Sequence, residues 1–282
     1  MMLGTIIREA QPKTGELYFW WLGQSGFVLK TDSLCIVTDP YLSTTLEEAT
    51  KNQKGKQHIR MMDIPALPTE LSHIDYVLIS HGHRDHYDRA TISGLLASNP
   101  TCTIIAPRVL VARIEEEHHC RTIGLDDGIH WQERGLVIEP IRAKHNSYDY
   151  DESTGYPYLS YALKIASHTI FFAGDTKPHT PLESFLAYKK PILAFLPING
   201  YSEELLEKGF ASNLTYMQAI ELALQTNVGI TVPCHYDMFT INTEQVGRFV
   251  NEANRQGLSY LVPTVFDTYI LEQGGTIRWI SH

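Results

Sequence analysis

Residues 81–86 read His-Gly-His-Arg-Asp-His, so four potential metal ligands stand within six positions. They follow directly on a short apolar run that has the composition of a buried strand. His81 and His83, two apart in an extended segment, would project to the same side, whereas Asp85 and His86 come after the chain turns. We therefore expect one loop to supply ligands to two metal positions. A solvated loop that is rich in histidine by chance is the alternative, and the density of ligands argues against it.

Three further candidate ligands follow β-rich runs later in the chain, namely His145, Asp175 and His235. Asp175 is suited to lie between two ions, because each of its oxygens can bind one cation and its charge offsets their repulsion. It could instead cap a helix, and the two histidines could be core residues with satisfied hydrogen bonds. We interpret the remaining histidines, His58 and His179 among them, as surface or structural residues.

A divalent ion at such a site lowers the pKa of bound water to about 7, and so supplies hydroxide at neutral pH without a serine or cysteine nucleophile. Asp85 and Asp175 are the candidate catalytic groups, since either carboxylate could orient the water and accept its proton. Histidine and carboxylate ligands accept zinc or manganese, with iron as a third option. The residues thus predict hydrolytic chemistry with divalent metal ions and leave open whether one ion or two are bound.

The spacing of apolar residues predicts alternating strands and helices in a single domain over residues 1–282, without a linker rich in Pro, Gly or Ser. The expected strands cover residues 16–22, 26–30, 34–39, 75–80, 101–106, 129–131, 136–141, 158–165, 168–175, 192–200 and 229–235. Asn213 and Thr243 are expected to cap two of the later helices. The polar stretch 43–62 has no clear period, so we expect a mobile surface segment that could cover the site.

The composition narrows the range of partners. With 23 Lys and Arg against 32 Asp and Glu, the net charge of -9 argues against nucleic acid as a substrate. The four cysteines form no CxxC pair, which predicts reduced thiols in a core. No apolar run approaches the ~20 residues needed to span a bilayer, and the N-terminus lacks the pattern of a signal peptide. We expect a cytoplasmic protein that acts on a small molecule, with no nucleic-acid or membrane partner.

The run HGHRDH matches the HxHxDH signature of the metallo-β-lactamase superfamily, and His145, Asp175 and His235 follow in the order of its remaining ligands. The chain is most similar to the branch that contains L-ascorbate-6-phosphate lactonase, through WLGQSGF (21–27), TDPYLS (38–43), LPING (196–200) and PCHYDMF (233–239). The resemblance implies an α/β (α+β) fold, a four-layer αββα sandwich with the metal site at one edge of the sheets. It also implies a homo-oligomer.

The resemblance further implies a role for each ligand. One ion would bind His81, His83 and His145, the other would bind Asp85, His86 and His235, and Asp175 would lie between them. Asp39 would orient a histidine from behind. Polar residues at strand ends and adjoining loops are candidates for substrate contact, and each is also a common turn former: Gln24, Asn146, Tyr148, Asn199, Tyr201 and Asp237.

We therefore predict metal-dependent hydrolysis of a lactone or another ester, with L-ascorbate 6-phosphate or a related sugar lactone as the substrate that the resemblance suggests. Asp149, Asp151 and Glu152, near the expected mouth of the site, would repel a phosphate group. Hydrolysis of a phosphodiester by the same ions is the nearest alternative. A non-catalytic metal-binding protein that retains the fold is the second alternative, favoured only if ligands were missing.

Overall fold

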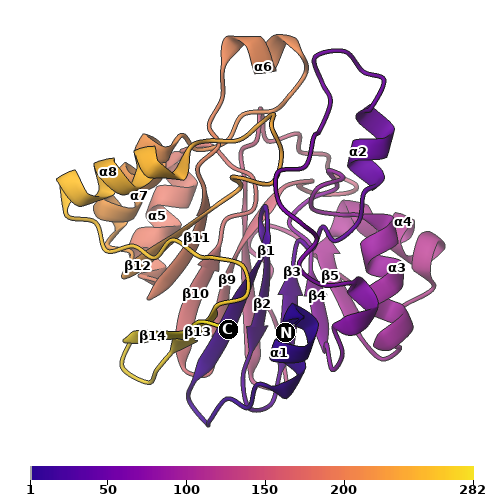
Figure 1. Cartoon of the computed structure of the whole chain (residues 1–282), viewed down its shortest axis with the longest axis vertical. Coiled ribbons are helices and arrows are strands. Elements are labelled where there is room, and N and C mark those ends of the chain that lie inside the picture. Colours follow the sequence, from indigo (N-terminus) through magenta and orange to yellow (C-terminus); the bar gives the residue numbers. More distant parts are fainter. Residues whose placement is uncertain (1) are drawn as a thin grey trace.

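Two β-sheets packed face to face form the centre of the protein, and helices cover both outer faces (Figure 1). The computed structural model describes residues 2–282. In spatial order the first sheet holds β14 (Ile277–Ile280), β13 (Thr268–Leu271), β1 (Leu17–Gly23), β2 (Gly26–Lys30), β3 (Cys35–Thr38), β4 (Tyr76–Leu78), β5 (Thr103–Pro107) and β6 (Thr122–Leu125). The second holds β12 (Ile230–Cys234), β11 (Leu193–Pro197), β10 (His168–Phe172), β9 (Leu159–Ile165), β8 (Leu136–Arg142) and β7 (Trp131–Glu133). The predicted four-layer αββα sandwich is confirmed.

Most of the helices lie in two groups on either side of the sheets, and α6 (Glu203–Glu207) lies in a projection at the top of the molecule (Figure 1). The other helices are α1 (Leu3–Glu9), α2 (Thr45–Thr50), α3 (Arg89–Ser98), α4 (Val111–His118), α5 (Thr180–Lys189), α7 (Tyr216–Thr226) and α8 (Val246–Gln256), with short 3-10 turns at Pro68–Glu70 and Arg108–Leu110. Helices α3 and α4 lie beside the first sheet, and α5, α7 and α8 lie beside the second. Within residues 2–282, no helix has the length and apolar character that crossing a membrane requires.

Aromatic side chains fill the space between the two sheets. The ring of Phe195 in β11 lies 4.2 Å from that of Phe27 in β2 and 5.7 Å from that of Phe19 in β1. The next residue along β1, Trp20, points to the opposite face and packs with Ile6 of α1 in a separate core. Strand β1 is therefore buried on both faces, which explains its nearly continuous apolar sequence.

The ends of several strands meet at one edge between the sheets. Strand β4 runs parallel to β3, and β10, β11 and β12 run parallel to one another, so their carboxyl ends lie together. Two backbone hydrogen bonds join the sheets at this edge, from Leu159 N to Ser80 O (3.1 Å) and from His235 N to Gln24 O (2.9 Å). The segments that follow β4 and β12 are thereby fixed relative to each other.

The stretch 43–62, expected as an irregular surface segment, is structured. It contains α2, and Arg60 Nε donates to Glu47 Oε1 (2.6 Å) while Arg60 Nη2 donates to Ser43 O (2.7 Å). Elements α1, β6 and α6 also lie outside the predicted set. Each has seven residues or fewer, a length at which helices depend on tertiary packing rather than on local sequence.

Two predicted helix caps are wrong. Helix α7 is capped by Thr215, whose side chain accepts from Gln218 N, and not by Asn213. Helix α8 begins after Gln245, which makes no side-chain cap. Thr243 instead accepts a hydrogen bond from Asp237 N (2.9 Å). Asn213 and Thr243 therefore fix loops rather than helix ends.

Gly174, just after β10, provides a test of the close approach between the sheets. Its φ is +57°, and a Cβ added there would lie 2.5 Å from the Cβ of Ser80. We predict that Gly174→Ala lowers the free energy of unfolding by about 3 kcal/mol, because it combines left-handed strain with a steric clash.

Gly128→Ala is the matched control, since φ there is +76° and the added Cβ meets no atom within 4 Å. We expect it to cost about 1 kcal/mol, from backbone strain alone. Urea unfolding compares the two variants, and equal losses would contradict the contact between Gly174 and Ser80.

Candidate metal centre

All seven predicted ligands lie together at the edge where the sheets meet. The ligand atoms of His81, His83, His145 and Asp175 lie within 4.8 Å of one another, and those of Asp85, His86 and His235 form a second such group. Asp175 lies between the groups, with Oδ1 3.3 Å from His86 Nε2 and Oδ2 3.7 Å from His145 Nε2. The sequence-predicted set is thus one cluster in space.

The distances between these atoms fit divalent ions. Two donors that each lie about 2.1 Å from an ion are about 3.4 Å apart at the tetrahedral angle. His235 Nε2 lies 3.5 Å from both Asp85 Oδ2 and Asp175 Oδ2, longer than an ordinary hydrogen bond. Within residues 2–282, Nε2 of His81, Nε2 of His86 and Oδ1 of Asp175 are buried without a hydrogen-bond partner. Buried ligand atoms that face one another without hydrogen-bond partners are suited to bind a cation, so the residues present fit the ions that the sequence predicts.

Asp39 and Ser80 orient two of the histidines. Asp39 is fully buried, its Oδ1 accepts from Ser80 N (2.7 Å), and its Oδ2 lies 2.6 Å from His86 Nδ1. Ser80 Oγ lies 2.9 Å from His81 Nδ1. In both histidines Nδ1 is held from behind and Nε2 faces the cluster, which is the usual arrangement of metal-binding imidazoles. Asp39 therefore lies where the sequence predicted it.

His145 is oriented by a backbone group. Its Nδ1 donates to Ser212 O (3.0 Å), so Nε2 carries the lone pair that faces Asp175. Burial lowers the pKa of His145 to about 4, although Asp175 opposes this shift. Asn146, a predicted substrate contact, accepts from Ser212 N (3.0 Å) and so ties the same two segments together.

Two histidines and two carboxylates carry opposite charges in the ion-free protein. Burial disfavours protonation of His86 and His235, but Asp175 and Asp85 outweigh it, raising the pKa of His86 well above its usual value and that of His235 to about 9. Burial raises the pKa of each carboxyl group, but His86 and His235 outweigh it and hold both values well below the usual range. Without ions, the positive charge of these two imidazoles therefore offsets the negative charge of the two carboxylates, as bound cations would.

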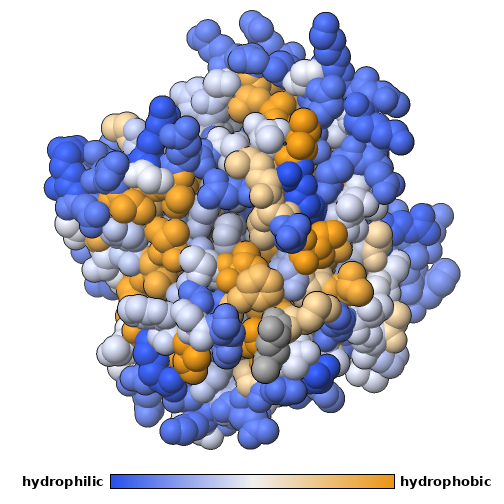
Figure 2. All heavy atoms as spheres, in the orientation of Figure 1, coloured by the Kyte–Doolittle hydropathy of each residue, from blue (hydrophilic) through white to orange (hydrophobic). Residues whose placement is uncertain are grey.

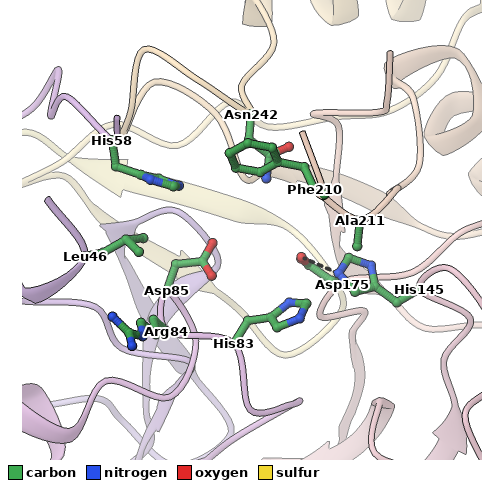
Figure 3. Close-up of a pocket in the computed structure, with 11 residues that line it drawn as sticks. Leu46, His58, His83, Arg84, Asp85, His145, Asp175, Phe210, Ala211 and Asn242 are labelled. Carbon is green, nitrogen blue, oxygen red and sulfur yellow. Dashed lines mark ion pairs between the residues drawn. The ribbon is translucent and has the colours of Figure 1, made fainter. Parts of the chain in front are cut away.

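A cavity of about 210 Å³ opens onto the cluster (Figure 3). Its walls are formed by Leu46, His58, His83, Arg84, Asp85, His145, Asp175, Gly209, Phe210, Ala211 and Asn242. Figure 3 shows His58, Phe210 and Asn242 across the cavity from His83. Sequence reasoning did not select His58, Phe210 or Asn242, which lie in segments without a regular pattern. Only the expectation that residues 43–62 could cover the site indicated that His58, which lies in this stretch, would be near it.

None of the six predicted substrate contacts is among the residues that line this cavity. Gln24 lies beside the second ligand group instead, with Nε2 2.8 Å from Asp85 Oδ2 and 3.2 Å from His235 Nε2. Asn199 donates to Asn242 Oδ1 (2.8 Å) and supports the cavity wall from outside. These polar residues hold ligands and loops in place.

The other predicted contacts lie farther out. Tyr201 is 52% exposed, and Asp237 is exposed and bonded through its backbone to the next loop. Tyr148 Oη lies 3.3 Å from Nδ1 of His179. His179 is buried at the N-terminus of α5, where Nδ1 accepts from Leu182 N (3.4 Å). It is thus a structural residue, as the sequence suggested.

The contact between Asp39 and His86 generates a prediction about metal affinity. Asp39→Asn keeps the size of the side chain but replaces the carboxylate that faces His86 Nδ1. We expect the affinity for zinc to fall between about 10-fold and 100-fold, as for other changes behind a metal-binding histidine. Competition with a chromogenic chelator measures the change, and Asp63→Asn, at an exposed position, is the control. Equal affinities in both variants would exclude this role for Asp39.

The raised pKa values of His86 and His235 predict how stability depends on pH. A group whose pKa is higher in the folded state stabilises the protein below its unfolded pKa, and this contribution is lost as pH rises through the folded value. The melting temperature of metal-free protein should therefore fall between pH 6.5 and pH 9, the range set by His235.

Bound metal requires neutral imidazoles, so the metal-loaded protein should not share this fall. The gain in melting temperature on adding zinc should consequently increase with pH, and differential scanning fluorimetry across the range tests this. A gain that shrinks as pH rises would contradict the assignment of protons to these two histidines.

Sequence comparison identifies the family. The β-lactamase superfamily domain matches residues 35–236. A UPF0173 metal-dependent hydrolase from Pyrococcus horikoshii is 27% identical over 237 residues, which covers 82% of this chain and 91% of that protein. A UPF0173 metal-dependent hydrolase from Thermoplasma acidophilum is 26% identical over 218 residues, which covers 75% of this chain and 90% of that protein.

Solved structures share the fold. Igni18, a metallo hydrolase from Ignicoccus hospitalis, superposes with a TM-score of 0.65 at 21% identity, covering 95% of this chain and 99% of that one. An isothiocyanate hydrolase from Delia radicum gut bacteria gives a TM-score of 0.67 at 17% identity, covering 88% of this chain and 96% of that one. With its domain matched and its two-sheet architecture shared, the chain belongs to the β-lactamase superfamily, as a relative of its metal-dependent hydrolases.

Proposed function

We propose that this protein hydrolyses lactones or other carboxylic esters with one or two divalent metal ions. The observation that carries the proposal is the openness of the cluster, since His83, Asp85, His145 and Asp175 all line the cavity. Structural metal sites enclose their ion with protein ligands, whereas catalytic sites leave a position for water and substrate. The resemblance to the lactonase branch favours lactones among the esters.

The two ligand groups define the proposed metal positions. His81, His83 and His145 would hold one ion and Asp85, His86 and His235 the other, and the Asp175 carboxylate lies near histidines of both groups. Such ions would polarise the carbonyl group of an ester and lower the pKa of coordinated water to about 7. Five imidazoles and two carboxylates suit zinc or manganese, with iron as a third option.

Two carboxylates are candidates to accept the proton of the attacking water. Asp85 and Asp175 both line the cavity, and Gln24 Nε2 fixes Asp85 by donating to its Oδ2 (2.8 Å). A carboxylate held in this way orients a water molecule and accepts its proton as the oxygen attacks. Both carboxylates would remain ionised beside divalent ions, as a group that accepts a proton must be.

The size and lining of the cavity favour a small organic substrate. Its volume of about 210 Å³ is below the roughly 300 Å³ at which pockets for drug-sized ligands begin. Leu46, Phe210 and Ala211 offer apolar surface for the carbon skeleton of a substrate. Asp149, Asp151 and Glu152, which were expected near the mouth, are not part of the cavity lining.

Arg84 supports a second candidate function. It lines the cavity directly beside the ligands and brings a permanent positive charge there. A guanidinium group binds phosphate oxygens well, so a small phosphodiester is the alternative substrate class. A non-catalytic role would require binding without turnover, and the same experiment distinguishes it.

The test begins with the metal content of protein purified without added metal, followed by assays with a lactone panel and bis-p-nitrophenyl phosphate. We predict that wild type hydrolyses lactones and that His86→Ala and Asp175→Ala each lower kcat/KM by at least about 10³-fold, because each removes a metal ligand. His130→Ala, which alters an exposed histidine outside the set of proposed ligands, should retain activity.

Turnover of the phosphodiester alone would select the second candidate function. A wild type that holds no metal and remains inactive after addition of zinc or manganese would refute hydrolysis altogether. Metal bound at full occupancy without turnover of any substrate would favour the non-catalytic role.

A further inference from the structure

His58 lies on the cavity wall opposite the metal ligands. It shares this wall with Phe210 and Asn242, and Figure 3 shows its imidazole directed into the space above Asp85. None of the proposed metal ligands comes from its segment. A histidine that faces the proposed ligands across a small cavity could contact the part of a substrate that points away from them.

The chain holds this imidazole firmly. His58 N donates to Thr50 Oγ1 (3.0 Å), and the ring packs edge-on against Phe239 (5.0 Å between centroids) and at a tilt against Phe210 (5.7 Å). Two residues later, Arg60 forms the largely buried ion pair with Glu47. Contacts from three segments therefore fix the position of His58. Such a fixed position is expected of a side chain that binds a substrate in a single orientation.

The backbone around His58 is also tied to the neighbouring segment of the same wall. Thr240 N donates to Ile59 O (2.9 Å), and Met61 N donates to Met238 O (2.8 Å). These bonds join the segment to the loop that carries Asn242. In Figure 2, hydrophobic side chains gather between the two projections at the top of the molecule, and hydrophilic ones cover their tips.

The ring nitrogens of His58 differ from those of the proposed ligands. His81, His86 and His145 each have Nδ1 held by a protein group. Nδ1 of His58 is buried without a hydrogen-bond partner within residues 2–282. Because no hydrogen bond of ordinary geometry commits the proton to Nδ1, the tautomer with the proton on Nε2 is available, and Nε2 can then donate to a group in the cavity.

We propose that His58 is a catalytic residue that donates a hydrogen bond from Nε2 to the leaving oxygen of the substrate, a role that rests on the proposed hydrolysis. In ester hydrolysis the oxygen of water forms a new bond to the carbonyl carbon, and the bond to the leaving oxygen breaks with its electron pair on that oxygen. The leaving oxygen then takes up a proton that derives from the attacking water. A hydrogen bond from His58 stabilises the charge that develops before this proton arrives.

This role predicts a dependence on the leaving group. His58→Phe keeps an aromatic ring against Phe210 and Phe239 but removes the hydrogen bond. In the metal-loaded protein, we expect kcat/KM to fall about 30-fold with ethyl acetate, whose alkoxide is a poor leaving group, and no more than about threefold with p-nitrophenyl acetate. His58→Gln retains an N–H donor and should recover most of the activity with the ethyl ester.

His130→Phe, the same substitution at an exposed position, is the matched control. Metal content and melting temperature are measured for each variant, so that a loss of structure or of metal is recognised. Equal losses with both esters, or no loss with ethyl acetate, would overturn the proposal. A loss confined to the poor leaving group supports it.

A second measurement tests the contact between His58 and the leaving oxygen separately from hydrolysis, so that failure of the contact and failure of the proposed function are distinguished. Phenol, which represents a released leaving group, is titrated into the metal-loaded protein by calorimetry. We expect the Kd of phenol to rise about fivefold in His58→Phe, the loss of roughly one hydrogen bond. An unchanged Kd, or no binding of phenol to wild type, would refute the contact.

Discussion

The metal centre depends on the contact between the ends of the two sheets, because its ligands are divided between them. The run that begins at His81 follows β4 of the first sheet, whereas Asp175 and His235 follow β10 and β12 of the second. Ser80 is the link: its carbonyl accepts from Leu159 N, and its N–H and hydroxyl bond to Asp39 and His81. A shift of one sheet against the other would therefore move the ligands apart and disturb the groups that orient them.

The electrostatics of the cluster explain why such a site is costly without its ions. Asp85 and Asp175 are removed from water, and isolated buried charges are strongly unfavourable. Without ions, protonated His86 and His235 compensate the two carboxylates. Several buried atoms of the cluster still have no hydrogen-bond partner, and its contacts are longer than ordinary hydrogen bonds. Divalent ions would satisfy the same carboxylates and free the imidazoles to act as neutral ligands. Ion binding and the protonation of two histidines are thus alternative ways to balance one charge distribution.

The sequence predicted the parts of the molecule in which local pattern and tertiary structure agree. The main strands and the ligand run could be derived because buried strands are apolar and because six residues held four ligands. Gln24 shows where prediction from local sequence pattern fails. Its polar side chain at a strand end suggested substrate contact, but its φ of +49° turns the chain so that the amide points to Asp85. His58 and Asn242 could not be selected, because long-range contacts such as Arg60 with Glu47 and Asn199 with Asn242 decide where their loops lie.

The two halves of the site follow different constraints, and this bears on how its substrate is chosen. The ligands stand on strand ends, where the sheets fix their geometry to the accuracy that metal binding needs. The opposite wall is built from irregular segments, which supply His58, Phe210 and Asn242. A fold shared at 17% to 21% identity does not fix the substrate. In the proposed function, the metal ligands would determine which kind of bond is attacked, and the loop-built wall would determine which molecule is held against them.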